Sequence, residues 1–114
     1  MTNELVKLAY HAIDEKKGQD IMVIDISEIS TIADYFIIAS GSNIKQVQAI
    51  CDNVTEILGK NGYNPKSTEG FENANWILLD YSDTIIHIFN QEDKKFYDLE
   101  RLWRDGKLIS EEDL

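Results

Sequence analysis

Residues 76–89 read Trp-Ile-Leu-Leu-Asp-Tyr-Ser-Asp-Thr-Ile-Ile-His-Ile-Phe, and the rest of the chain can be placed around this segment. Its two ends, 76–79 and 84–89, are rich in the β-branched and aromatic residues that are typical of strands. Residues 80–83 between them, Asp-Tyr-Ser-Asp, include side chains that bond their own backbone in turns. The segment therefore predicts a β-hairpin.

The second arm of this hairpin is apolar on both of its faces. On an alternating strand Ile85, His87 and Phe89 share one face, and the residues between them share the other. Strands with two apolar faces are usually central strands that are covered on both sides of the sheet. We therefore expect Ile86 and Ile88 to be buried against a helix.

The segments around the hairpin predict a mixed α+β architecture, an α/β sandwich. Apolar residues at helical spacing predict helices over residues 3–17, 44–58 and 93–104. Apolar runs predict further strands over 21–26, 35–39 and 63–67, and Pro65 places the last of these at a sheet edge. The expected order gives five strands and three helices, with the long helix as a crossover of the βαβ kind.

The composition is that of one globular domain. The chain has 114 residues, 43% of them hydrophobic, one cysteine and a formal net charge of −10. No apolar run approaches the roughly 20 residues of a membrane helix, and the first residues are unlike a signal or transit peptide. We therefore expect a cytoplasmic protein with no membrane contact and, since RNA binding depends on basic residues, little direct RNA contact.

Residues 1–104 are expected to form that single domain, and residues 105–114 an acidic C-terminal tail. Residues 107–114, Lys-Leu-Ile-Ser-Glu-Glu-Asp-Leu, are identical to the end of a widely used epitope tag. Both a tag origin and a native origin stay open, so the tail is kept out of the functional interpretation.

The sequence contains one junction that could hold a phosphate. Gly41-Ser42 lies between a predicted strand and the long helix, and backbone amides at a helix start can bind a phosphate. A nucleotidyltransferase would follow Gly-Ser with a strand carrying two metal-binding acids, but the positions that follow here are helical. Asn43 with Gln46 resembles a capping box, so the junction also fits an ordinary turn and helix cap.

Other reactive residue types are scattered. Cys51 falls on the apolar stripe of the long helix, which is typical of a buried structural thiol. His87 and His11 are distant from each other and have no carboxylate constellation, so they favour packing or interface roles over metal binding. Trp76 fits a core residue or an interface anchor equally well. We expect no catalytic residue, metal site or cofactor.

Six short motifs follow one another along the chain. They are Asp34-Tyr35-Phe36, residues 45–50 (Lys-Gln-Val-Gln-Ala-Ile), Glu69-Gly70, residues 76–80 (Trp-Ile-Leu-Leu-Asp), residues 86–89 (Ile-His-Ile-Phe) and residues 97–103 (Tyr-Asp-Leu-Glu-Arg-Leu-Trp). In these motifs, their order and their spacing, the chain resembles the Iojap family, the ribosomal silencing factors, from the first helix to Trp103.

The resemblance implies a five-stranded mixed sheet with flanking helices, related to nucleotidyltransferases but without their catalytic acids. It also implies that the protein binds ribosomal protein L-fourteen of the large subunit, blocks subunit joining by steric occlusion and lowers translation when nutrients are short. Several family members form homodimers. The alternatives are a small nucleotidyltransferase or phosphate-ester hydrolase using Gly41-Ser42, Asp25 and His87, and a dimeric adaptor.

We expect the partner-binding surface on the hairpin and the loop before it. An apolar surface with an aromatic anchor and a carboxylate rim matches the anatomy of an interface with a basic partner. The expected surface residues are Trp76, Leu78, Asp80, His87 and Phe89, with Glu69 and Asp83 at the rim.

Overall fold

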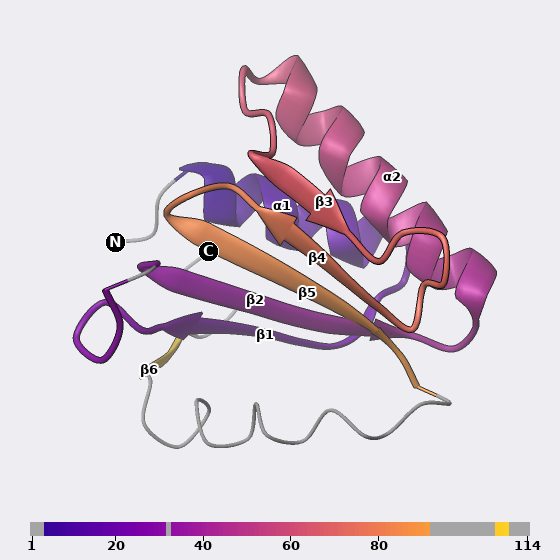
Figure 1. Ribbon diagram of the computed structural model, residues 1–114, viewed down its shortest axis with the longest axis horizontal. Coiled ribbons are helices and arrows are strands. Elements are labelled where there is room, and N and C mark those ends of the chain that lie inside the picture. Colours follow the sequence, from indigo (N-terminus) through magenta and orange to yellow (C-terminus); the bar gives the residue numbers. More distant parts are fainter. Residues whose placement is uncertain (1–3, 32, 92–106, 110–114) are drawn as a thin grey trace.

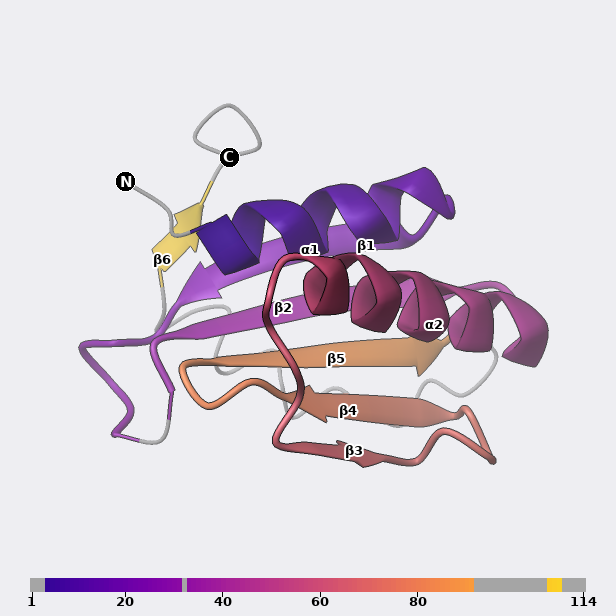
Figure 2. The same ribbon diagram turned by 90° about the horizontal axis from the view of Figure 1, so that it is seen from above.

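The computed structural model describes residues 4–31, 33–91 and 107–109, and it has two layers. One layer is a mixed sheet with the strand order β3-β4-β5-β2-β1-β6. The other holds the two described helices, which lie side by side over the same face of the sheet (Figures 1 and 2). The elements are α1 (Glu4–Glu15), β1 (Gln19–Asp25), β2 (Tyr35–Gly41), α2 (Ile44–Lys60), β3 (Ser67–Glu69), β4 (Trp76–Asp80), β5 (Thr84–Asn90) and β6 (Lys107–Ile109).

The hairpin is confirmed and lies in the middle of the sheet. β4 and β5 pair antiparallel, with Trp76 opposite Phe89 and Asp80 opposite Ile85. The turn between them is closed by the backbone amide of Ser82, which donates to Asp80 Oδ1 at 2.8 Å. On its other side β5 pairs in parallel with β2, so β5 is a central strand as expected.

Two expectations about the strands need correction. The strand expected at 63–67 begins only at Ser67 and ends at Glu69, because Pro65 has no amide for a ladder and the chain first turns back from α2. Its place at the sheet edge is confirmed. Besides the five expected strands, residues 107–109 form β6 by pairing with β1, whereas the sequence predicts a tail there. The helix expected at 93–104 lies outside the described residues.

The main core fills the space between the helices and the sheet. Ile86 and Ile88 of β5 are fully buried there, as the apolar pattern predicted. They meet the stripe of α2, whose buried members include Val47, Ile50 and Val54. Burying an aliphatic side chain of this size contributes about 1.5–3 kcal/mol, so this seam is a major source of stability.

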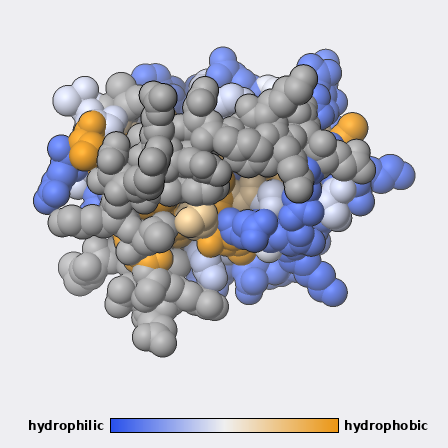
Figure 3. Space-filling view, turned by 90° about the horizontal axis from the view of Figure 1, so that it is seen from below, coloured by the Kyte–Doolittle hydropathy of each residue, from blue (hydrophilic) through white to orange (hydrophobic). Residues whose placement is uncertain are grey.

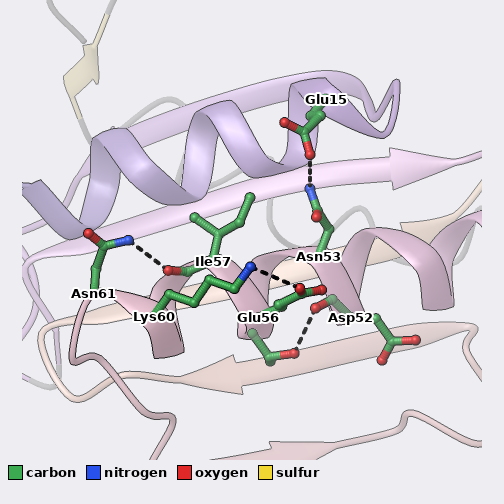
Figure 4. A network of polar contacts seen from close by, with 8 residues as sticks. Glu15, Asp52, Asn53, Glu56, Ile57, Lys60 and Asn61 are labelled. Carbon is green, nitrogen blue, oxygen red and sulfur yellow. Dashed lines mark hydrogen bonds and ion pairs between the residues drawn. The ribbon is translucent and has the colours of Figure 1, made fainter.

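Asn53 ties the two helices together through a buried polar contact. Its side-chain amide donates to the Ala12 carbonyl at 2.8 Å. It also donates to Glu15 Oε1 at 3.1 Å, and Figure 4 shows this second bond. A buried amide is stable only when it is hydrogen-bonded, and here α1 supplies both acceptors. This bond fixes the register of α1 against α2.

Cys51 provides a direct test of the α2 assignment. Its thiol is buried, and burial with the nearby Asp52 raises its pKa to about 12. Since only the thiolate reacts, native Cys51 should be labelled by a thiol reagent at least about a hundredfold more slowly than in denaturant. The rate of thiol labelling at pH 8, measured once in the folded protein and once in denaturant, gives this ratio.

The variant Asp52→Cys supplies the matched control for that labelling experiment. Position 52 is the next residue on α2 and is exposed, so its thiol should react quickly. Equal rates at both positions in the folded protein would show that the buried stripe has been assigned to the wrong side of the helix.

Candidate functional site

The face of the sheet opposite α1 and α2, here called the distal face, carries the expected surface residues. Alternation along β4 and β5 puts Ile77 and Ile88 toward the helices and Trp76, Leu78 and His87 on the distal face. Strand register then aligns side chains across this face: Glu69 beside Leu78, Leu78 beside His87, and His87 beside Ile38. Figure 3 looks onto this face, where hydrophobic side chains show in the middle and hydrophilic ones gather beside them.

An aromatic cluster occupies the part of the distal face where β4 begins. Trp76 lies over Phe89 with ring centroids 5.3 Å apart, and the ring of His87 stacks on that of Phe89 with an interplanar angle of 8°. Phe36 of β2 closes the cluster, 4.7 Å from the imidazole. Aromatic pairs at these separations stabilise beyond the area that they bury, so the four rings form one packed unit.

Trp76 is exposed and His87 is buried within this unit. The indole is 41% exposed, whereas His87 is 3% exposed. Trp76 Nε1 donates to His87 Nδ1 at 3.0 Å. Burial lowers the pKa of His87 to about 4, so the imidazole is neutral at pH 7 and its Nδ1 can accept this bond.

The acidic members of the expected surface lie around the border of the distal face. Asp80 is half-buried at the end of β4, Asp83 is exposed in the hairpin turn, and Glu69 is exposed on the edge strand β3. The carbonyl of Asp83 accepts from the amides of Asp34 and Tyr35, at 2.8 and 3.1 Å, which fixes the turn against the start of β2. These bonds hold the backbone of Asp83 in place, and its exposed side chain extends from a fixed turn.

The loop before β4 depends on a glycine that fixes the position of Trp76. Gly70 has φ +81°, and a Cβ at this position would overlap the carbonyl oxygen of Trp76. The Ala74 amide donates to the Gly70 carbonyl, and the Asn90 amide donates to the Asn75 carbonyl. Any side chain at position 70 would therefore displace the start of β4, because the loop passes close to the strand backbone.

The structure brings six of the seven expected residues onto one face and puts the seventh, Asp83, at its border. They differ in what they can offer a partner. Trp76, Glu69 and Asp83 are exposed, Leu78 and Asp80 are half-buried, and His87 and Phe89 are buried. The last two therefore meet a partner only through Trp76, which they support from beneath.

Sequence reasoning missed Phe36 as a member of the aromatic cluster. The motif Asp34-Tyr35-Phe36 carries part of the family resemblance, but by itself it does not indicate a binding surface. Phe36 reaches the cluster because β2 pairs in parallel with β5, which puts Ile85 beside Phe36 and His87 one step further along. The alternation in residues 35–39 shows that Phe36 and Ile38 share a face, but only the strand order shows which neighbour they meet.

The Gly41-Ser42 junction forms a helix cap. The Asn43 side chain accepts from the Gln46 amide at 2.9 Å, and Gln46 Oε1 accepts from the Ser42 amide at 2.7 Å. Two of the amides that could hold a phosphate are therefore already bonded to side chains. Gln46 Nε2 also donates to the carbonyls of Lys16 and Lys17, which ties the cap to the end of α1.

The four residues of the enzymatic alternative do not form one site, because Asp25 lies far from the Gly41-Ser42 turn. Asp25 pairs with Tyr35 at one end of β2, and Gly41 lies at the other end. Six residues of strand separate the two positions by about 20 Å. Within residues 4–31, 33–91 and 107–109, no group of three or more His, Cys, Asp or Glu side chains could hold a metal ion, and no helix is long and apolar enough to cross a membrane.

Comparison with known proteins gives consistent matches over nearly the whole chain. The sequence model described as "Ribosomal silencing factor during starvation" matches residues 1–114. The ribosomal silencing factor of Bacillus subtilis is 40% identical over 104 residues, which are 91% of this chain and 88% of that protein. The corresponding protein of Halalkalibacterium halodurans is 38% identical over 106 residues, 93% of this chain and 91% of its own.

A solved structure shows the same fold. A crystal structure of a protein from Bacillus halodurans superposes with a TM-score of 0.85 at 34% sequence identity. The superposition covers 96% of this chain and 99% of the other. The arrangement of sheet and helices is therefore shared with a protein of nearly the same length.

Proposed function

Since the chain belongs to the ribosomal silencing factor family, we propose that it binds the large ribosomal subunit through ribosomal protein L-fourteen and prevents joining of the small subunit. The match of the family to all 114 residues carries this proposal. The protein acts in the cytoplasm as a repressor of translation under nutrient limitation. Its mechanism is steric occlusion, which needs no cofactor and no catalytic step.

The distal face supplies a surface that fits this role. It offers an exposed indole that is packed on Phe89 and hydrogen-bonded to His87, with Leu78 beside it. Exposed tryptophans on a rigid apolar support are frequent hot spots of protein interfaces. Glu69 and Asp83 add carboxylates at the border, and these suit a basic ribosomal protein.

The overall charge also supports a protein partner. The chain carries 21 acidic and 11 basic side chains, giving −10 in total. Such a surface is repelled by the phosphates of ribosomal RNA and attracted to basic proteins that lie among them. We therefore place the direct contact on the ribosomal protein, with little direct RNA contact.

The enzymatic alternative is disfavoured by geometry. Asp25 and Gly41 lie at opposite ends of β2, the amides at the junction are bonded to Gln46 and Asn43, and His87 is buried. A homodimer remains part of the proposal as a state of the free protein. A generic dimeric adaptor would share that state but would not bind isolated large subunits.

The decisive experiment is co-sedimentation with purified large ribosomal subunits, followed by a subunit-joining assay. The protein should pellet with large subunits, stay in the supernatant with small subunits and lower the yield of joined ribosomes. Absence of both effects, with circular dichroism confirming the fold, would exclude the proposed function. Joining that is blocked without large-subunit binding would point to a different target.

The border carboxylates should act mainly on the rate of association. Glu69→Lys and Asp83→Lys each replace an exposed carboxylate by an ammonium group, which weakens steering toward a basic partner. We expect slower association at low salt, by about threefold to tenfold, and a shallower dependence on salt. Surface-immobilised large subunits would give the rates at several salt concentrations.

Asp52→Lys is the matched control for these charge changes. It makes the same change in net charge at an exposed position on α2, on the opposite side of the sheet. If Asp52→Lys slows association as much as Asp83→Lys, the total charge matters and the distal border does not.

A further inference from the structure

The hydrogen bond between Trp76 and His87 joins an exposed side chain to a buried one. The donor Trp76 Nε1 and the acceptor His87 Nδ1 are 3.0 Å apart. The imidazole itself packs against the rings of Phe36 and Phe89, with ring centroids 4.7 and 6.2 Å away. A side chain fixed in this way can determine the orientation of the indole that it binds.

The chemistry of the two groups fixes the protonation of the imidazole. An indole nitrogen can only donate, so Nδ1 of His87 carries no proton and the neutral ring has its proton on Nε2. The low pKa of His87, about 4, agrees with a ring that remains neutral at pH 7. Protonation of Nδ1 would place two N–H donors against each other and break the bond.

Packing alone does not account for a histidine at this position. Nε2 of His87 is buried and finds no hydrogen-bond partner within the described part of the chain. An unsatisfied buried donor costs free energy, whereas an apolar ring of similar size would fill the same space without that cost. Unlike an apolar ring, however, histidine can accept the hydrogen bond from Trp76.

We infer that His87 is a positioning residue for partner binding. It holds the indole of Trp76 in one orientation, and it accepts the hydrogen bond of Nε1, the only polar atom of the indole. The exposed part of the indole then presents ring carbon to the partner and no N–H donor. This inference rests on the proposed function, because the partner is the one proposed there. It adds a role for a buried residue that contacts no partner atom.

The first test uses the free protein and does not depend on the ribosome. In His87→Phe the ring is kept and the acceptor is lost, whereas in His87→Asn the side-chain oxygen stands in for Nδ1. We expect the Trp76 indole N–H to exchange with solvent about tenfold faster in His87→Phe, which corresponds to a loss of about 1.4 kcal/mol in the free energy that protects the N–H. In His87→Asn it should exchange at close to the wild-type rate. The indole signals in ¹⁵N NMR spectra, assigned with Trp103→Phe, give these rates.

The second test measures binding of the same variants to large subunits. His87→Phe should bind about tenfold more weakly, and His87→Asn should bind within about twofold of the wild type. A folded His87→Phe protein with an unchanged indole exchange rate, or with faster exchange and unchanged binding, overturns the inference. If the wild type does not bind large subunits, the proposed function fails, and a role for His87 in partner binding fails with it. The exchange data still decide whether His87 orients Trp76.

A measurement on the unmodified protein covers the case in which the variants fail to fold. The ¹⁵N shifts of the two histidine rings, distinguished with the exposed-site variant His11→Gln, report which nitrogen is protonated. We expect His87 at pH 7 to show protonated Nε2 and unprotonated Nδ1. A proton on Nδ1 would overturn the inference without any variant at position 87.

Discussion

Trp76→Ala is expected to weaken binding to the large ribosomal subunit by about 2 kcal/mol or more, which is a loss of roughly thirtyfold in affinity. The variant removes an indole that is 41% exposed yet packed on Phe89 and bonded to His87, the combination found at interface hot spots. The fold should survive, because Trp76 lies outside the core between the helices and the sheet. Co-sedimentation over a range of protein concentrations measures the affinity.

Ile44→Ala provides the matched control for that loss. Ile44 is also an exposed large apolar side chain, at 46%, but it belongs to the first turn of α2, on the other side of the sheet. Its replacement should leave binding within about 0.5 kcal/mol of the wild type, as for most surface changes. If Trp76→Ala binds and blocks joining as well as Ile44→Ala does, the partner contacts a different surface.

Ile88→Asp is expected to unfold the domain. Ile88 is fully buried in the seam between β5 and α2, where it belongs to the main cluster of apolar side chains. Burying an unpaired carboxylate costs several kcal/mol in addition to the lost apolar contacts, which is comparable with the whole stability of a small domain. Thermal melting followed by circular dichroism should show no cooperative transition at neutral pH.

Ile44→Asp makes the same chemical change at an exposed site and should melt close to the wild type. A carboxylate in the first turn of α2 even interacts favourably with the helix dipole. Ile88→Val, which removes one methylene from the core, should cost only about 0.5–1.5 kcal/mol. An Ile88→Asp protein with the wild-type melting temperature would mean that the central strand is exposed.

The sequence predicted the elements well where local pattern and tertiary packing demand the same residues. The alternation in residues 84–89 and the stripe of α2 are both imposed by burial, so they could be read directly. The Asn43 cap and the Asp80–Asp83 turn were also readable, because their hydrogen bonds join residues two or three positions apart. The third strand was misplaced because Pro65 and a three-residue strand leave almost no pattern.

What the sequence determined by itself was the α+β architecture, the hairpin, the apolar α2 stripe and the family resemblance, since each depends on spacing along the chain. Only the tertiary structure decided that Phe36, Trp76, His87 and Phe89 form one cluster, that His87 is buried while Trp76 is exposed, and that Asp25 lies far from Gly41. These facts depend on strand order and register, which join residues far apart in sequence. A period-two pattern says which residues share a face, but the same pattern fits several neighbours, and only the packed sheet selects one.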